Sequence, residues 1–162
     1  MKKIPLSQQG KNAGKYFALV DDEDYERLNK NFWQVHSTGK GIYASCKKRE
    51  NGKQICYLMH RMILNCNNGE IIDHIDGNTL NNQKNNLRVC TFTQNAQNKK
   101  KQRNNKSGYK GVDVHRNKWR ATIAVKRKTI NIGIYKTPVA AARAYNKKAL
   151  ELFGEFARLN NV

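Results

Sequence analysis

The chain has 162 residues and a mass of 18.7 kDa, enough for one medium-sized domain or two small ones. Its hydrophobic share of 38% favours small cores and large polar faces. Because 31 Lys and Arg residues stand against 12 Asp and Glu, the formal net charge is +19, which favours a polyanionic partner such as nucleic acid. Neither a membrane-spanning apolar run nor an apolar signal region is found, so we expect a soluble protein without a membrane partner.

The positive charge is concentrated in the C-terminal part. Residues 1–98 contain 14 basic and 9 acidic side chains, a net charge of +5, whereas residues 99–162 contain 17 and 3, a net charge of +14. Between the two parts, residues 99–106 are basic and polar and have no apolar anchor, which predicts a linker that contacts phosphates. We therefore expect a first domain over 1–98 and a second over 107–162.

The four cysteines do not predict a zinc site. Cys46, Cys56, Cys66 and Cys90 are spaced 10, 10 and 24 residues apart, without the C-x-x-C pair that structural zinc sites use. Four cysteines could form two disulfides, but a basic protein without a signal peptide belongs in a reducing compartment. We expect four free, mostly buried thiols and no structural zinc.

The first half of the chain predicts a small antiparallel sheet. Residues 16–20 predict a strand, and the acids that follow suit the start of a helix over 21–28 better than a metal site. An apolar stretch at 60–64 predicts a helical turn. Three further short strands, separated by Gly-containing turns, are predicted at 33–35, 42–46 and 55–59.

Residues 69–98 predict a strand, a turn, a strand or loop, and then a helix. A short apolar strand leads Asp73 and His74 into a turn. The Asn-rich segment 81–89 predicts a polar loop, since Asn side chains bond nearby backbone groups. Thr93 predicts the N-cap of the helix.

The C-terminal part predicts three strands and a helix. Residues 108–135 alternate between apolar and polar side chains, which predicts three strands with one buried face. Thr137 and Pro138 predict the N-cap and first position of a helix over 139–153 that packs across the sheet and ends at Gly154. The side chains expected to face the helix are Val112, Val114, Trp119, Ala121, Ile123, Val125, Ile130, Ile132 and Ile134.

The pattern HR…IDHIDGN…NN…NNLR…T…N…N over residues 55–100 resembles the HNH, or ββα-metal, nucleases, in the branch of phage and intron-encoded homing endonucleases. The resemblance implies that His74 is the general base, since an imidazole titrates near neutrality. It implies that Asn86 is the central Asn that orients this base, a second catalytic position. Asp73 and Asn95 are then the protein ligands of one Mg²⁺, with Mn²⁺ as the alternative ion. Many members have His where this chain has Asn95, which affects the choice of metal.

Residues 107–160 resemble the DNA-binding domain first named for the plant Apetala and ethylene-response-factor regulators. The shared landmarks include Tyr109-Lys110-Gly111-Val112, Trp119-x-Ala121-x-Ile123 and Ile132-Gly133-x-Tyr135. In that family a three-stranded sheet enters the major groove of duplex DNA and a helix supports it. Asp113 and Ala124 stand where plant members often have Arg, so the plant target sequence is not carried over. The expected DNA-binding residues are Arg61 in the nuclease part and Lys110, His115, Arg116, Lys118, Arg120, Thr122, Lys126, Arg127, Lys128 and Asn131.

Together these features predict an α+β fold: a small N-terminal antiparallel sheet leading into a ββα-metal nuclease motif, then a three-stranded antiparallel sheet packed on one helix. The predicted function is a site-directed DNA endonuclease, a monomer or weak dimer in the cytoplasm of a bacterial or phage-infected host cell. Two alternatives stay open. The first is a DNA-binding regulator with an inactive nuclease fold, because Asp-His and Asp-Gly-Asn also occur in ordinary turns, and the second is an RNA-binding protein. The role of His60 is left open.

Overall fold

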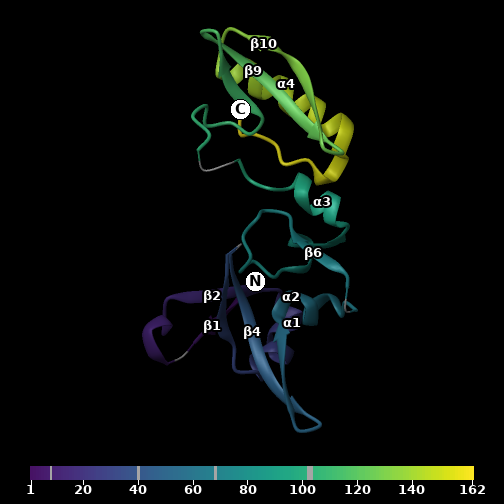
Figure 1. Ribbon diagram of the computed structural model, residues 1–162. Coiled ribbons are helices and arrows are strands. Elements are labelled where there is room, and N and C mark those ends of the chain that lie inside the picture. The colour runs from purple at the N-terminus through teal and green to yellow at the C-terminus, as the bar shows by residue number, and fades with distance from the viewer. Residues whose placement is uncertain (8, 40, 68, 102–103) are drawn as a thin grey trace. The chain divides into compact units, whose positions relative to one another are not determined.

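Figure 1 shows a computed structural model of the chain, which describes residues 1–7, 9–39, 41–67, 69–101 and 104–162. The chain forms two compact units, Met1–Thr91 and Phe92–Val162. Both combine short helices with small antiparallel sheets, so the predicted α+β class is confirmed. The division falls after Thr91, whereas the sequence favoured a first domain that extends to residue 98. Gln102 and Arg103 of the predicted linker lie outside the described residues.

The first unit begins with an antiparallel strand pair. Strand β1 (Lys2–Leu6) pairs with β2 (Tyr16–Val20), and a short 3-10 helix, η1 (Gly10–Asn12), lies between them in the chain. Strand β2 and the following helix α1 (Asp22–Asn29) were predicted, but β1 was not. Pro5 cannot donate to a strand ladder, which disguises β1 in the sequence. The strand forms at an edge, where Ile4 and Leu6 are buried in the core.

The second sheet of this unit has the strand order β3-β4-β5, all antiparallel. The strands are β3 (Gln34–Thr38), β4 (Gly41–Glu50) and β5 (Lys53–Leu58), each longer than or shifted from its predicted range. Trp33, which is 2% exposed, packs in the core, and its Nε1 donates to Leu28 O at 2.8 Å. Helix α2 (Met59–Leu64) follows β5 directly, as predicted.

A two-stranded antiparallel sheet completes the first unit. It pairs β6 (Ile71–His74) with β7 (Leu87–Cys90), and the 3-10 helix η2 (Lys84–Asn86) leads into β7. Of the two alternatives after the turn, strand or loop, residues 87–90 therefore form the strand. Residues 75–86 between β6 and β7 form a long connection that the site depends on.

The second unit begins with helix α3 (Phe92–Gln97). Since the helix starts at Phe92, Thr93 lies within its first turn, and the prediction of Thr93 as N-cap is wrong. The sheet order is β10-β9-β8, with β8 (Val112–His115), β9 (Lys118–Val125) and β10 (Lys128–Tyr135). Helix α4 (Pro138–Phe153) lies against this sheet (Figure 1) and is followed by the 3-10 helix η3 (Gly154–Phe156). Thr137 caps α4 by accepting from Ala140 N at 3.1 Å, as predicted.

The buried face of this sheet differs from the predicted set at three positions. Val114, Ile130 and Ile134 are 58%, 38% and 48% exposed. The register of β10 against β9 shifts between Asn131 and Gly133, which marks a β-bulge at residue 132. A bulge reverses the alternation beyond it, so Ile134 faces outward and Tyr135 takes its place in the core. Strict alternation could not predict this change.

All four thiols are free; Cys46 and Cys90 are buried, Cys66 is half-buried and Cys56 is exposed. Among the residues that the structure describes, no helix is both long and apolar enough to cross a membrane.

Gly111, directly before β8, allows the backbone to lie close to the side chain of Tyr145 on α4. A Cβ at this position would lie 2.2 Å from Tyr145 Cδ2 and 2.6 Å from Thr122 O, and the φ of +71° already disfavours other residues. We predict that Gly111→Ala lowers the free energy of unfolding of this unit by about 3 kcal/mol, measured by urea denaturation. Gly154→Ala is the control, because it shares a positive φ of +52° but has open space around its Cβ; it should cost about 1 kcal/mol. Equal losses in the two variants would contradict the steric explanation.

Candidate active site

His74 lies at the end of β6, and its side chain is 5% exposed. Its Nε2 is 3.3 Å from Asn82 Oδ1. The Nδ2 of Asn82 donates to Leu80 O at 3.3 Å, which leaves Oδ1 facing the imidazole as an acceptor. A neutral His74 therefore carries its proton on Nε2 and has Nδ1 as its basic nitrogen.

The loop that brings Asn82 to His74 is closed by the side chain of Asn86. Asn86 Nδ2 donates to Asp76 Oδ1 at 3.0 Å and to Asn81 O at 2.8 Å, while its Oδ1 accepts from Asp76 N at 3.0 Å. Asp76 also accepts from Asn78 N at 2.7 Å and from Asn81 Nδ2 at 2.9 Å. Asn86, at the end of the loop, is therefore bonded both to its start and to its middle.

These hydrogen bonds also hold Asp76 ionised. Burial raises the pKa of its carboxyl group, but hydrogen bonds from Asn81, Asn78 and Asn86 outweigh burial and leave the pKa below the usual value. The carboxylate is therefore an acceptor for the loop, which is a structural task.

The first half of the unit fixes the loop from outside. Leu19 N donates to Leu80 O at 2.8 Å, and Asn82 N donates to Leu19 O at 2.8 Å, so β2 holds the residues on both sides of the loop's apex. The carboxylate of Asp21 accepts from Gln83 Nε2 at 3.0 Å and from Lys84 N at 2.8 Å. Asp21 stands at the N-terminal end of α1, which explains part of the acidic run there without a metal ion.

Asp73 precedes His74 on β6 and is 6% exposed. Its Oδ2 accepts from Arg88 Nη2 at 2.8 Å and from Arg88 Nε at 3.1 Å, and the two residues are cross-strand partners on β6 and β7. The pair compensates the charge of a carboxylate that is almost fully buried. Arg88 therefore keeps Asp73 beside His74.

Two aromatic groups surround the His74 ring. The His60 ring lies 5.3 Å away, nearly perpendicular to it, and the Tyr43 ring lies 6.3 Å away. His60, whose role the sequence left open, is a buried neighbour of the site on α2. Burial lowers the pKa of His60 to about 3, with smaller contributions from the charges of His74 and Arg61, so His60 stays neutral at physiological pH.

Burial also lowers the pKa of His74 below its usual value. The hydrogen bond with Asn82 and the carboxylates of Asp76 and Asp73 act in the opposite direction without cancelling the effect of burial. The imidazole is therefore neutral at pH 7 and able to accept a proton.

Asn95 and Arg61 are the remaining predicted site residues of the nuclease motif. Asn95 is half-buried on α3 and belongs to the second unit, so its place beside Asp73 stays a prediction. Arg61 donates to the backbone oxygens of Asn67 and Glu70, the latter at 2.8 Å, so its guanidinium supports the turn after α2. In the described part of the chain, no three His, Cys, Asp or Glu side chains are close enough together to hold a metal ion.

The residues expected to bind DNA in the second unit fall into two groups. Exposed side chains lie in the two hairpin turns of the sheet and on its outer face: Arg116, Lys118, Lys126, Arg127, Lys128 and Asn131, with His115 and Thr122 half-buried. Two others have protein partners. Arg120 pairs with Asp113 through bonds of 3.1 and 2.8 Å, and Lys110 donates its ammonium proton to Gln97 O.

The sequence missed Asn82, Tyr43 and His60 as neighbours of the predicted base. Asn82 had a signal, since it forms part of the Asn-rich motif, although no role was assigned to it. Tyr43 had none, because a strand residue far away in the chain becomes a neighbour only through the sheet.

The family described as HNH endonuclease matches residues 57–97 of the chain. An uncharacterized HNH endonuclease, L560, of Acanthamoeba polyphaga mimivirus is 32% identical over 151 residues, which are 90% of this chain and 75% of the relative. Protein 3.8 of Escherichia phage T7 is 38% identical over 92 residues, which are 56% of this chain and 75% of the relative. No solved structure matches.

The segment that the family matches contains the buried pair Asp73 and His74, the loop closed by Asn86, and α3. Since the mimivirus relative is in addition similar over 90% of the chain, the protein belongs to the HNH endonuclease family.

Proposed function

We propose that the protein is a site-directed DNA endonuclease of the homing type, which hydrolyses a phosphodiester bond in one DNA strand per active site. The observation that carries this proposal is the environment of His74: the imidazole is buried, burial lowers its pKa, and its Nε2 lies 3.3 Å from Asn82 Oδ1, an arrangement that would leave Nδ1 as the basic nitrogen. We further propose that it acts as a monomer or weak dimer in the cytoplasm of a bacterial or phage-infected host cell.

In the proposed reaction, His74 Nδ1 takes a proton from the water that attacks the scissile phosphorus. Asn82 stabilises the imidazolium that results, because its amide oxygen lies 3.3 Å from Nε2 and can accept the Nε2 proton. Asn86 acts one step further out, since it closes the loop that presents Asn82. A nuclease with one such centre cuts one strand, and a double-strand break requires a second centre.

The residues available suit a hard divalent ion. Asp73 has a carboxylate and Asn95 an amide oxygen, and Mg²⁺ commonly binds one or two such groups and keeps several waters, with Mn²⁺ as the alternative. An ion held by Asp73 and Asn95 would stabilise negative charge on the scissile phosphate and on the leaving oxygen. Arg88 has the separate task of holding Asp73 in place.

We propose that the second unit selects the DNA site through its sheet, as the resemblance to the Apetala and ethylene-response-factor domain implies. Two observations support this. The outer face of β9 and β10 carries polar side chains such as Thr122 and Asn131, which form a cross-strand pair. The turn between these strands carries Lys126 and Arg127, both in the left-handed region with φ of 46° and 67°. Basic residues in such a turn are strained, and Asn-Gly would be the more stable pair there. Their presence favours a role for the two positive charges.

We predict that His74→Ala lowers the cleavage rate by roughly 10²–10⁴-fold and changes the affinity for duplex DNA only a few-fold. A plasmid-nicking assay with Mg²⁺ and a binding titration in EDTA measure the two quantities. His36→Ala, which alters an exposed histidine of β3, is the control and should cut at the wild-type rate. Cleavage by His74→Ala at the wild-type rate would show that the mechanism is wrong.

Asn82→Ala should lower kcat by about 10–100-fold, because His74 loses the acceptor that fixes its tautomer. The KM for DNA should change little, since Asn82 is 1% exposed and cannot touch the substrate. Steady-state cleavage rates over a series of DNA concentrations give kcat and KM separately, and circular dichroism checks the fold. A rise in KM with unchanged kcat would assign Asn82 to substrate binding instead.

Replacing Lys126 with Asn and Arg127 with Gly should raise the free energy of unfolding by about 1 kcal/mol, because these residues tolerate a positive φ. The same change should weaken duplex binding in EDTA. Lys126→Gln with Arg127→Gln is the matched control, which removes the charges without relieving the backbone. If the Asn-Gly variant bound DNA as tightly as the wild type, the turn would have no part in DNA binding.

A further inference from the structure

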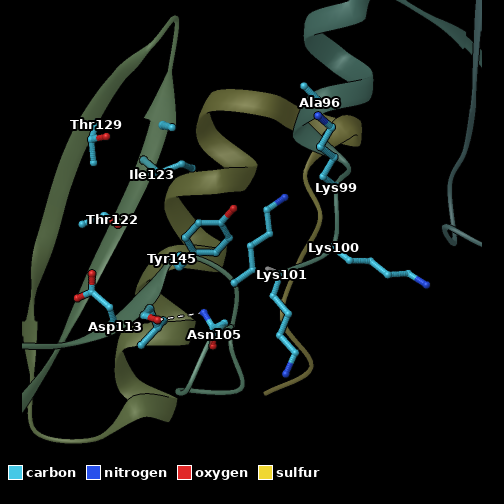
Figure 2. A pocket seen from close by; sticks show the side chains of 14 residues that line it. Ala96, Lys99, Lys100, Lys101, Asn105, Asp113, Thr122, Ile123, Thr129 and Tyr145 are labelled. Carbon is cyan, nitrogen blue, oxygen red and sulfur yellow. Dashed lines mark hydrogen bonds between the residues drawn. The ribbon is translucent and has the colours of Figure 1, made fainter. Parts of the chain in front are cut away.

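The outer face of the sheet in the second unit contains an ion pair to which the proposed function assigns no task. Arg120 on β9 is followed by Ala121, which is 0% exposed and packs against α4. Asp113 on β8 likewise follows Val112, which is 2% exposed. Figure 2 shows the carboxylate of Asp113 pointing away from Tyr145 of α4. Because neighbouring side chains of a strand point to opposite faces, Arg120 and Asp113 lie on the face away from the helix.

Asp113 holds the guanidinium group of Arg120 through two hydrogen bonds. The two residues are cross-strand partners, and Arg120 donates from Nε to Oδ1 at 3.1 Å and from Nη2 to Oδ2 at 2.8 Å. Two parallel bonds fix the plane of the guanidinium, which a single contact would leave free to rotate. The side chains of Arg120 and Asp113 are still 38% and 49% exposed, so the fixed group is open to a further partner.

The ion pair leaves one edge of the guanidinium unoccupied. A guanidinium has five N–H donors, and Asp113 accepts one from Nε and one from Nη2. Both N–H groups of Nη1 and the second of Nη2 remain, and among the residues that the structure describes no other group accepts from Arg120. Along this edge Nη1 and Nη2 each direct one N–H outward in parallel. The edge therefore fits a partner with two neighbouring acceptors.

Duplex DNA offers two partners of this kind: a backbone phosphate, and the major-groove edge of guanine with its O6 and N7. The charge of the ion pair favours guanine. Because the carboxylate of Asp113 offsets the guanidinium, the pair as a whole attracts a phosphate weakly, and the carboxylate repels phosphate oxygens that come near it. The edge of guanine carries no net charge and is not subject to this repulsion.

The place of Arg120 in the sheet also favours a base. It lies on β9, the central strand, whereas Lys126 and Arg127 lie in the turn at one end of the sheet. Its cross-strand partner on β10 is Ile134, which is 48% exposed on the outer face. An apolar side chain beside the guanidinium suits the base edges of a groove, where a thymine methyl is an apolar contact, better than it suits a charged phosphate.

We infer that Arg120 reads one guanine of the target, with Nη1 and Nη2 donating to O6 and N7 in the major groove, and that Asp113 is the positioning residue that orients the guanidinium. The inference rests on the proposed binding of duplex DNA by the outer face of this sheet. It adds the identity of one base to that proposal.

The first experiment selects duplexes from a library with a randomised segment, in EDTA, where DNA is not cut. The full-length wild type is compared with Arg120→Ala, with Arg120→Lys, which keeps the charge but not the paired donors, and with Arg143→Ala, which removes a guanidinium from an exposed position on α4. Wild type and Arg143→Ala should select the same motif with one required guanine. Both Arg120 variants should accept any base at that position and bind the wild-type motif about 5–150-fold more weakly.

A base analogue tests the proposed contact at one atom. Each guanine of the selected duplex is replaced in turn by 7-deazaguanine, which keeps O6 and base pairing but has C–H in place of N7. At one position the replacement should weaken wild-type binding by about 10-fold. The same replacement should leave the binding of Arg120→Ala unchanged, because that variant makes no contact with N7.

Asp113→Asn tests the positioning role, because it removes one of the two carboxylate acceptors and nearly preserves the size of the side chain. It should relax the preference for guanine at the same position. Its affinity for duplexes of other sequence should rise or stay equal, since a negative charge is removed from the DNA-binding face. A role in stability alone would weaken binding to all sequences alike, and a preference for guanine as strong as that of the wild type would overturn the positioning role.

Selection of the same guanine by Arg120→Ala would overturn the inference. Uniform weakening across sequences, with a loss of about 0.9 in the slope of log K against log salt, would also overturn it, since this is the signature of a phosphate contact. Circular dichroism checks each fold, and Arg120→Lys keeps the test available if Arg120→Ala unfolds. A wild-type chain that binds duplex DNA without requiring a guanine would overturn the inference and leave the proposed function intact. A chain that does not bind duplex DNA would overturn both.

Discussion

The geometry of the candidate active site depends on the hydrogen bonds with which Asn86 closes the loop of residues 75–86. The loop is polar and has little apolar surface to bury, so its shape must come from directed bonds. Asn86 satisfies this need by joining Asp76 and Asn81 through one amide group. Because β2 pairs with the loop on both sides of its apex, the closed loop is also fixed to the core. The orientation of His74 follows, since Asn82 is carried by that loop.

This arrangement explains how much of the site was predictable. Adjacent residues such as Asp73 and His74, and an asparagine directly before the next strand, form a pattern that can be recognised in the sequence. The partners that make them functional do not: Arg88 reaches Asp73 through strand pairing, and Tyr43 reaches His74 from another sheet. The fold shows the same division. Helix α4, with its cap and terminal glycine, was predictable from local chemistry, whereas the bulge in β10 was not, because it depends on pairing with β9.

The second unit is tightly packed in its core and strained in its exposed hairpin turns. Its core is tight where α4 meets the sheet, and Gly111 leaves no room for even one more carbon atom beside Tyr145. Its hairpin turns, in contrast, hold Arg116, Lys126 and Arg127 at positive φ, where glycine or asparagine would be more stable. The strain in these turns therefore lies at exposed basic residues, outside the packed core.

Helix α3 belongs to the second unit but contains a residue proposed for the nuclease site. A six-residue helix is too short to be stable alone and depends on tertiary contacts. The carbonyl of its last residue, Gln97, accepts from the Lys110 ammonium group. The backbone N–H of Lys110 in turn donates to Asn160 Oδ1. The helix is therefore held by residues far along the chain. Asn95 lies on this helix. Asn95, one of the two proposed metal ligands, is therefore on a helix that is supported by the unit proposed to bind DNA, and the two parts of the chain cannot be separated at residue 98 without removing that support.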